Sequence, residues 1–323
     1  MTDINDMTGK RCLVTGAAGF LGANLARGLL ARGAEVHATV RNSSDPWRIR
    51  DIAKDLFLHF VDMAARDQVN RVVQQAKPQL IFNTAVGRSN LDAMSRANVA
   101  GVFNLIEATQ DLVYQRLVHF GSSQEYGQHQ RPLNEKMPAD PVLPFAMTKA
   151  LGSVILSHHA QARNLPVTVL RPFSVYGFWE GPGRLIPTAF SAARSGRALP
   201  LTGPGYRRDL IFVEDVTEAA LLAAVTDSAP GEIFNIGSGR QYDNTEVVDA
   251  VASAAGSRIE VVQGAYAARC SDTGHWVADI SKARELLGWQ PRYSLAAGLS
   301  RTAAWMDEHA QHYRAAATAL MEI

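Results

Sequence analysis

The segment TGAAGFLG, residues 15–22, constrains the fold of this chain more than any other feature. It spaces Gly16, Gly19 and Gly22 three residues apart, directly after the apolar run RCLVTG (11–16) and at the start of the helical pattern FLGANLARGLLARG (20–33). In such a strand–turn–helix unit the first glycine permits a tight turn, the second lets the backbone approach a pyrophosphate, and the third lets helix and strand pack closely. The first helical turn then offers free N–H groups to phosphate. With a second strand at 35–40, the pattern predicts a dinucleotide site rather than a purely structural turn, and we include Phe20 and Leu21 in it.

The rest of the first half repeats this alternation of strand and helix. β-Branched and apolar runs at 35–40, 57–62, 80–85, 116–122 and 166–172 alternate with helical patterns at 65–76, 93–111 and 146–163. This spacing predicts an α/β fold, a Rossmann-type doubly wound parallel sheet covered by helices on both faces. We therefore expect a dinucleotide-binding lobe over residues 1–172.

After residue 172 the regular alternation of strand and helix patterns ends. The stretch FSVYGFWEGPGR is rich in glycine, proline and aromatic residues, and shorter irregular elements follow it. We expect residues 173–323 to form mainly a smaller α+β substrate lobe, with segments near 210–240 returning to the first lobe, because no Pro/Ser-rich linker separates two domains.

Composition excludes several classes of function. The 323 residues carry a net charge of +1 without a Lys/Arg block, so no nucleic-acid partner is expected. No apolar run of about 18 to 20 residues predicts a membrane span, and the N-terminus has no signal-peptide pattern. The two cysteines, Cys12 and Cys270, follow no metal-ligand spacing, so we expect no metal and a cytoplasmic location.

The end of the second strand indicates which dinucleotide binds. A carboxylate there would accept hydrogen bonds from the ribose hydroxyls of NAD. This chain has Arg41 and Asn42 instead, and a guanidinium could pair with the 2′-phosphate of NADP. We therefore favour NADP(H) over NAD(H); the alternative is that Arg41 is a solvated loop residue. Asp62 is placed to contact adenine or to cap a turn.

Taken together, the motifs resemble the extended short-chain dehydrogenase/reductase family of nucleotide-sugar epimerases, dehydratases and ketoreductases. The likeness covers nearly the whole chain and is carried, in order, by TGAAGFLG, NVAGVFNLIEA (98–108), FGSSQEYG (120–127), the helix around Lys149, LRPFSVYG (170–177), RRDLIFVEDV (207–216), FNIGSG (234–239) and WVADISKARELLGWQPRYSLAAGL (276–299). The resemblance implies further cofactor contacts from Met63, Thr84, Ala85, Asn98, Lys149 and Pro172.

The resemblance also implies catalytic roles. Ser122 would polarise the substrate oxygen, and Lys149 would bond the nicotinamide ribose and lower the pKa of a neighbouring Tyr. That Tyr position is occupied by Phe145, which has no proton to give. Three explanations remain open: a deliberate Tyr→Phe change that traps substrate, an enzyme that uses another acid, or a non-catalytic cofactor binder.

The residues after Ser122 distinguish the possible reactions. The family's 4,6-dehydratases carry an acid–base pair there, whereas this chain has Ser123 and Gln124, and an amide cannot serve as that base. Glu125 could partly substitute. The pattern looks most like NADP(H)-dependent reductases of 4-keto-6-deoxy nucleotide sugars. A nucleotide-sugar epimerase with tightly bound NAD(P) and a silent binder are the alternatives.

The resemblance places cations of the second lobe around the substrate diphosphate. Arg208 and Arg269 match the family pattern, Arg184 is a less certain third, and Ser174 stands where many relatives carry Asn. Arg88, after the strand at 80–85, is either a substrate contact or a loop charge. The family commonly forms homodimers, and the helices at about 93–111 and 146–163 would form that interface.

Overall fold

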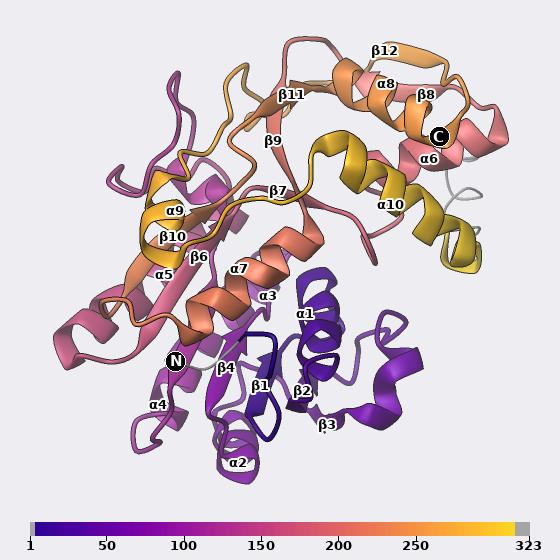
Figure 1. Cartoon of the computed structure of the whole chain (residues 1–323). Helices are drawn as coiled ribbons and strands as arrows, with labels where there is room; N and C mark the ends of the chain where they lie inside the picture. The colour runs from indigo at the N-terminus through magenta and orange to yellow at the C-terminus, as the bar shows by residue number, and fades with distance from the viewer. Residues whose placement is uncertain (1–3, 314–323) are drawn as a thin grey trace.

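A computed structural model describes residues 4–313 of the chain. Its main lobe contains a seven-stranded sheet in the order β10-β6-β5-β4-β1-β2-β3, in which each strand pairs parallel to its neighbours (Figure 1). The strands are β1 (Arg11–Thr15), β2 (Glu35–Val40), β3 (Phe57–Phe60), β4 (Leu80–Asn83), β5 (Arg116–Phe120), β6 (Val167–Pro172) and β10 (Glu232–Ile236). The predicted Rossmann-type fold is confirmed.

Helices cover both faces of this sheet, as the alternating pattern requires. They are α1 (Phe20–Leu30), α2 (Arg66–Ala76), α3 (Leu91–Ser95), α4 (Gly101–Ala108), α5 (Pro144–Arg163), α7 (Val213–Val225) and α9 (Ser281–Leu287), with the short turns η1 (Arg50–Asp55), η2 (Arg96–Ala100) and η3 (Ser123–Tyr126). The order of the strands reverses between β1 and β4. In open α/β sheets ligands bind beyond the carboxyl ends of the strands at such a reversal.

The second lobe lies to one end of the sheet and contains two small sheets and three helices (Figure 1). Its elements are β7 (Ser174–Tyr176), α6 (Leu185–Ser195), β8 (Leu199–Thr202), β9 (Arg207–Phe212), β11 (Gln241–Asp243), α8 (Asn244–Ala255), β12 (Val261–Tyr266), α10 (Leu295–Glu308) and the turn η4 (Ala310–His312). Between β9 and β11 the chain passes back through α7 and β10 of the main lobe. The segments near 210–240 thus connect the two lobes.

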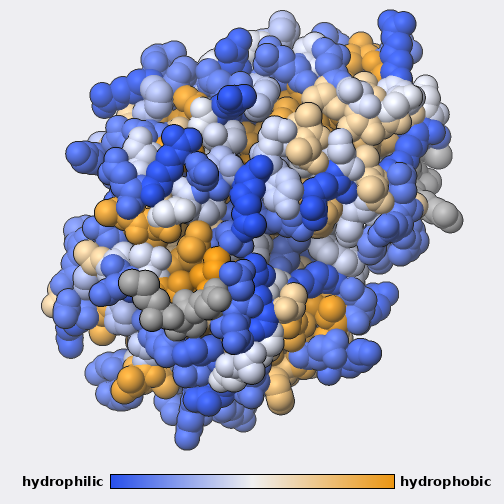
Figure 2. Space-filling model, viewed as in Figure 1, coloured by the Kyte–Doolittle hydropathy of each residue, from blue (hydrophilic) through white to orange (hydrophobic). Residues whose placement is uncertain are grey.

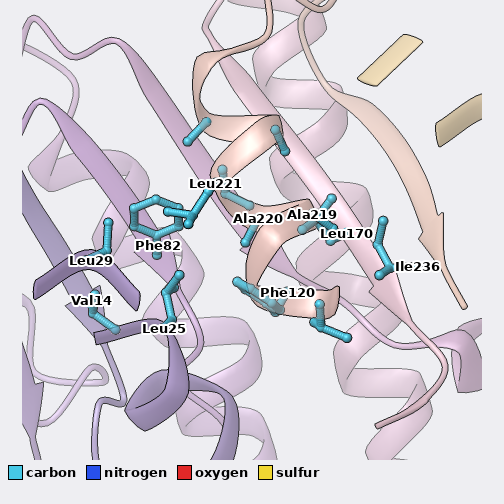
Figure 3. Close-up of a cluster of buried hydrophobic side chains, with 14 of the residues drawn as sticks. Val14, Leu25, Leu29, Phe82, Phe120, Leu170, Ala219, Ala220, Leu221 and Ile236 are labelled. Atoms are coloured by element: carbon cyan, nitrogen blue, oxygen red, sulfur yellow. The ribbon is translucent and has the colours of Figure 1, made fainter. Parts of the chain in front are cut away.

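Buried apolar side chains pack the helices against the sheet. Figure 3 shows one such cluster, in which Leu25 and Leu29 of α1 and residues of α7 pack over Val14, Phe82 and Phe120 of the central strands. Each buried Leu or Phe side chain contributes about 1.5–3 kcal/mol. The face of the molecule in Figure 2 is largely hydrophilic, with hydrophobic residues in separate patches. Within the described residues no helix has the length and apolar character needed to cross a membrane.

The predicted helix over 93–111 differs from the structure in an informative way. It consists of α3, the π-helical turn η2 and α4, which ends at Ala108. The π turn points the buried Asn98 side chain inward, where its amide bonds both backbone groups of Gly87 and the hydroxyl of Thr148. Sequence periodicity contains no signal for this turn, because long-range hydrogen bonds stabilise it.

Candidate active site

A cavity of about 560 Å³ opens at the carboxyl ends of β1, β2 and β4. The predicted cofactor residues that line it are Gly16, Gly19, Arg41, Asp62, Met63, Thr84 and Ala85. The structure does not place the others on its wall; these are Phe20, Leu21, Gly22, Asn42, Asn98, Lys149 and Pro172. Asn98 is turned into the protein, as described above, and Pro172 is buried at the end of β6.

Gly16 and Gly22 are required because other backbone atoms of the protein lie too close to leave room for a side chain, whether or not a ligand is bound. Gly16 has φ +70°, and a Cβ there would lie 2.7 Å from the Cα of Ala85. A Cβ on Gly22 would lie 2.5 Å from the carbonyl oxygen of Gly16 and 2.7 Å from Oγ1 of Thr84. Side chains at either position would push the loop off the sheet edge and fill the cradle beside α1.

The cradle suits a dinucleotide. Helix α1 begins at this loop, its N-cap residue Gly19 makes no side-chain capping hydrogen bond, and its first turn carries no acid. Since Gly19 lies on the cavity wall, the free backbone N–H groups of the first turn and the partial positive charge of the helix lie next to the cavity, where a pyrophosphate would be stabilised. NAD(P) would lie across this loop with its adenosine towards β2.

Two arginines lie near Asp62 on the wall of this cavity. Arg96 donates to Oδ2 of Asp62 at 2.6 Å, and both residues line the cavity together with Arg41. Burial alone would raise the pKa of Asp62, but the Ala64 amide, Arg96 and Arg41 hold it below its usual value. Arg96 was not predicted, because it lies within an otherwise ordinary helical pattern.

Arg48 is a second residue that the sequence analysis missed. Its Nε donates to the carbonyl of Trp179 at 2.7 Å, its Nη1 reaches the carbonyl of Ala18 at 3.4 Å, and its guanidinium lies 4.4 Å from the ring centre of Trp47. It thus connects the glycine loop to the second lobe. Its position in an irregular loop gave no signal.

Lys149 lies buried at the end of β5. Its Nζ donates to the carbonyl oxygen of Phe120, next to Gly121 and Ser122. Burial lowers the pKa of Lys149 to about 8, against the opposing charge of Glu125 and with a smaller contribution from Arg88. Ser122 is half-buried, caps the turn η3 and accepts from the amide of Gln124 at 3.2 Å.

Glu125 is not available to contact substrate or to replace the missing proton donor, which corrects that expectation. The residue is fully buried, and its Oε2 accepts from Nε of Arg171 at 2.8 Å. Its Oε1 accepts from the amide of Ser122 and the hydroxyl of Ser153, both at 2.8 Å. Glu125 therefore stabilises the turn that carries Ser122. Ser123 is also buried, and Gln124 is half-buried beside it.

Phe145 lies in the first turn of α5, and Arg88 covers its ring. The guanidinium carbon of Arg88 is 4.3 Å from the ring centre, within the range of a cation–π contact. Thr148 connects the two segments, because its hydroxyl donates to the carbonyl of Phe145 at 3.0 Å and accepts from Asn98 at 2.9 Å. Arg88 is thus placed in direct contact with the residue at the Tyr position.

A second cavity, of about 440 Å³, lies in the smaller lobe. All four residues predicted there for the substrate line it: Ser174, Arg184, Arg208 and Arg269. Arg208 donates to Oδ1 of Asp272 at 2.7 Å. The wall also contains Glu180, whose pKa is raised to about 8 by burial despite the nearby Arg184. Four tyrosines that had not been predicted also line this cavity: Tyr176, Tyr206, Tyr242 and Tyr266.

Comparison with known proteins gives a consistent result. The model of the NAD dependent epimerase/dehydratase family matches residues 12–237. A UDP-glucose 4-epimerase of Mycolicibacterium smegmatis is 31% identical over 318 residues, which are 93% of this chain and 100% of that protein. A dTDP-glucose 4,6-dehydratase of Neisseria gonorrhoeae is 29% identical over 332 residues, covering 92% of this chain and 95% of the relative.

Solved structures share the whole architecture. The epimerase Mth375 of Methanothermobacter thermautotrophicus superposes with a TM-score of 0.88 at 28% identity, covering 97% of this chain and 96% of the other. A UDP-glucose 4-epimerase of Thermus thermophilus, solved with NAD, has a TM-score of 0.83 at 28% identity and covers 92% of this chain and 99% of the other.

Proposed function

The chain belongs to the NAD dependent epimerase/dehydratase family, within the extended short-chain dehydrogenases/reductases, and from this premise we propose that it is an NADP(H)-dependent oxidoreductase acting on a nucleotide-linked sugar. We propose a 4-keto-6-deoxyhexose as the sugar and reduction of its keto group as the reaction. The nicotinamide would supply the hydride, and the protein would bind, orient and polarise the sugar oxygen.

The observation that carries this proposal is the pairing of two different cavities. One has a glycine-rich loop at a helix N-terminus, which suits a dinucleotide. The other gathers the guanidinium groups of Arg184, Arg208 and Arg269 with four tyrosines. Forked guanidinium groups match phosphate oxygens, and aromatic rings provide surfaces on which a base can stack. Together they fit a cofactor and a nucleoside diphosphate sugar.

Two groups at the end of β5 would act on the sugar. The Ser122 hydroxyl is half-buried on a rigid turn and can donate to a carbonyl oxygen. Lys149, as an ammonium ion, would bind a hydroxyl of the nicotinamide ribose. It would also place positive charge near the sugar oxygen, where negative charge develops during the reaction. Since its pKa is about 8, both protonation states are accessible near neutral pH.

Elimination of water is disfavoured as the reaction. Positions 123 and 124 carry a hydroxyl and an amide, and the carboxylate of Glu125 is fully buried and hydrogen-bonded. No carboxylate of the segment 122–125 is therefore free to act as base towards a substrate. Epimerisation is the second candidate, because relatives that match over nearly the whole chain at 28–31% identity are named epimerases.

The preference for NADP(H) is part of the proposal. Arg41 is exposed on the wall of the dinucleotide cavity beside Ser43 and Ser44, where a 2′-phosphate could accept hydrogen bonds. The structural neighbour from Thermus thermophilus was solved with NAD, so this preference needs a direct test. Binding of NADPH and NADH, followed by nicotinamide fluorescence, provides it.

We also propose a homodimer that buries the outer faces of α4 and α5. Met147, Leu151 and Val154 lie at i, i+4 and i+7 on α5 and are at least two-fifths exposed, as is Phe103 on the adjacent α4. An exposed apolar stripe on paired helices is typical of a helix-bundle interface.

The test of the function compares this protein with Phe145→Tyr. Both would be mixed with NADPH and a panel of 4-keto-6-deoxy nucleotide sugars, and oxidation of NADPH would be followed. Net consumption of NADPH supports a reductase, whereas interconversion of UDP- or dTDP-hexoses with retained cofactor supports an epimerase. Inactivity of both proteins towards every sugar would contradict an enzymatic function and favour a cofactor-binding protein.

A further inference from the structure

The contact between Arg88 and Phe145, beyond the carboxyl end of β4, is a feature that the proposed reaction leaves unexplained. Arg88 extends from the loop after β4, at the carboxyl edge of the sheet, and its guanidinium lies over the Phe145 ring at 4.3 Å. Its place in the fold is therefore the edge at which a substrate meets the cofactor in open α/β sheets.

The loop that carries Arg88 is held rigidly. The amide of Gly87 donates to Oδ1 of Asn98 at 2.9 Å, and the carbonyl of Gly87 accepts from Nδ2 of Asn98 at 3.2 Å. A Cβ on Gly87 would lie 1.8 Å from the carbonyl oxygen of Ala93, so the loop is also pressed against α3. Since Asn98 bonds Thr148 as well, one buried amide fixes the spacing between Arg88 and Phe145.

The charge of Arg88 is not neutralised by the protein. Among residues 4–313, Arg88 forms no ion pair with a carboxylate, and its guanidinium contacts the aromatic ring of Phe145. Desolvation by neighbouring protein atoms and the like charge of Arg184 lower the pKa of Arg88, although more than a third of the residue is exposed. Arg88 in turn acts on Lys149, whose nearby acid Glu125 is already bonded to Arg171. The surroundings of Arg88 and Lys149 therefore have a surplus of positive charge.

We infer that Arg88 contacts the reacting oxygen of the sugar and stabilises negative charge on it, and that Phe145 is the platform that positions Arg88. This inference rests on the proposed nucleotide-sugar function and adds a catalytic residue to it. A planar guanidinium held over a ring keeps the N–H groups that do not face the ring free to donate to a ligand. The pair would thus supply the hydrogen bond that a Tyr hydroxyl supplies in relatives, while the proton itself would come from water.

Ligand binding tests the contact without depending on turnover. Dissociation constants would be measured calorimetrically for UDP-, dTDP- and GDP-glucose, and the tightest ligand would be compared with its 4-deoxy counterpart, which lacks the oxygen in question. Arg88→Gln removes the charge. Arg163→Gln is the matched control, because Arg163 is exposed at the far end of α5, about 30 Å away.

We expect the wild type to bind the 4-deoxy ligand about tenfold to a hundredfold more weakly than the hydroxylated one, because a hydrogen bond to a charged group is lost. Arg88→Gln should bind the two ligands within about threefold of each other, and Arg163→Gln should behave as the wild type. Phe145→Leu keeps the charge of Arg88 but removes the ring. It should retain only part of the difference in affinity between the hydroxylated and the 4-deoxy ligand. Circular dichroism would verify that each variant is folded.

Three outcomes would overturn the inference. The first is that the 4-deoxy ligand loses as much affinity for Arg88→Gln as it loses for the wild type. The second is the absence of any loss in the wild type. The third is an Arg88→Gln variant that binds both sugars and the free nucleoside diphosphate equally weakly, which would place Arg88 on the diphosphate. If no nucleotide sugar and no nucleoside diphosphate binds, the proposed function itself fails and this inference with it.

Discussion

Replacement of Glu125 by Gln should destabilise the protein far more than its conservative chemistry suggests. The Glu125 side chain is fully buried and accepts three hydrogen bonds, from Arg171, Ser122 and Ser153. An amide has one acceptor oxygen, so its NH₂ group would face either the Nε–H of Arg171 or the Ser122 amide, donor against donor. Arg171 would also keep a buried charge without a counterion. Removal of one partner of a buried ion pair costs about 3–5 kcal/mol.

Unfolding in urea, followed by tryptophan fluorescence and by circular dichroism, measures this cost. The two signals should give one transition if unfolding is two-state. The control is Asp307→Asn, because Asp307 pairs with Arg194 at 2.6 Å but is 70% exposed. We expect this surface change to alter the free energy of unfolding by less than about 1 kcal/mol.

A double variant makes the argument refutable. Glu125→Gln with Arg171→Met removes the uncompensated charge as well as its partner, so part of the lost stability should return. The reasoning is wrong if Glu125→Gln alone costs less than about 1 kcal/mol, or if the double variant is less stable than Glu125→Gln. Either result would mean that the buried pair is solvated or rearranges freely.

Three further predictions follow from the site. Lys149 is an ammonium ion below its pKa of about 8, so turnover should fall as the pH rises through about 8. Lys149→Met should lose about 100-fold in kcat and should no longer show this pH dependence. If kcat of Lys149→Met still falls at alkaline pH, the dependence belongs to another group. Arg41→Ala should weaken NADPH binding about tenfold and leave NADH binding within about twofold, measured by nicotinamide fluorescence; equal weakening of both would show that Arg41 does not read the 2′-phosphate. Leu151→Glu should convert a dimer into a monomer in sedimentation velocity, whereas Leu286→Glu, at an equally exposed leucine of α9, should not; a Leu151→Glu dimer would place the interface elsewhere.

Local sequence patterns predicted most elements well, because their causes are local. The bounds of β2 equal the predicted range 35–40, and α2 begins only one residue after the start of the predicted range 65–76. The glycine spacing predicted the turn before α1, since only glycine fits beside Ala85 and Thr84. The predicted cations of the second lobe do share one cavity.

The misses have a common physical origin in long-range contacts. Nothing near Asn98 in the sequence signals the π turn, because its hydrogen-bond partners Gly87 and Thr148 are 11 and 50 residues away. Glu125 reads as a candidate acid by its spacing, but Arg171, 46 residues later, pairs with it inside the protein. Arg96 and Arg48 line the dinucleotide cavity because the folded chain brings their segments next to the glycine loop.

The sequence by itself determined the class of fold, the glycine loop and the family, since each depends on periodicity or on residues close together in the chain. It also established that position 145 carries no hydroxyl. Only the tertiary structure decided what that means for the site. It placed Arg88, from a loop 57 residues earlier, over the Phe145 ring, because Asn98 joins the two segments. A side chain's charge can be read from its letter, whereas its partner depends on how distant segments pack.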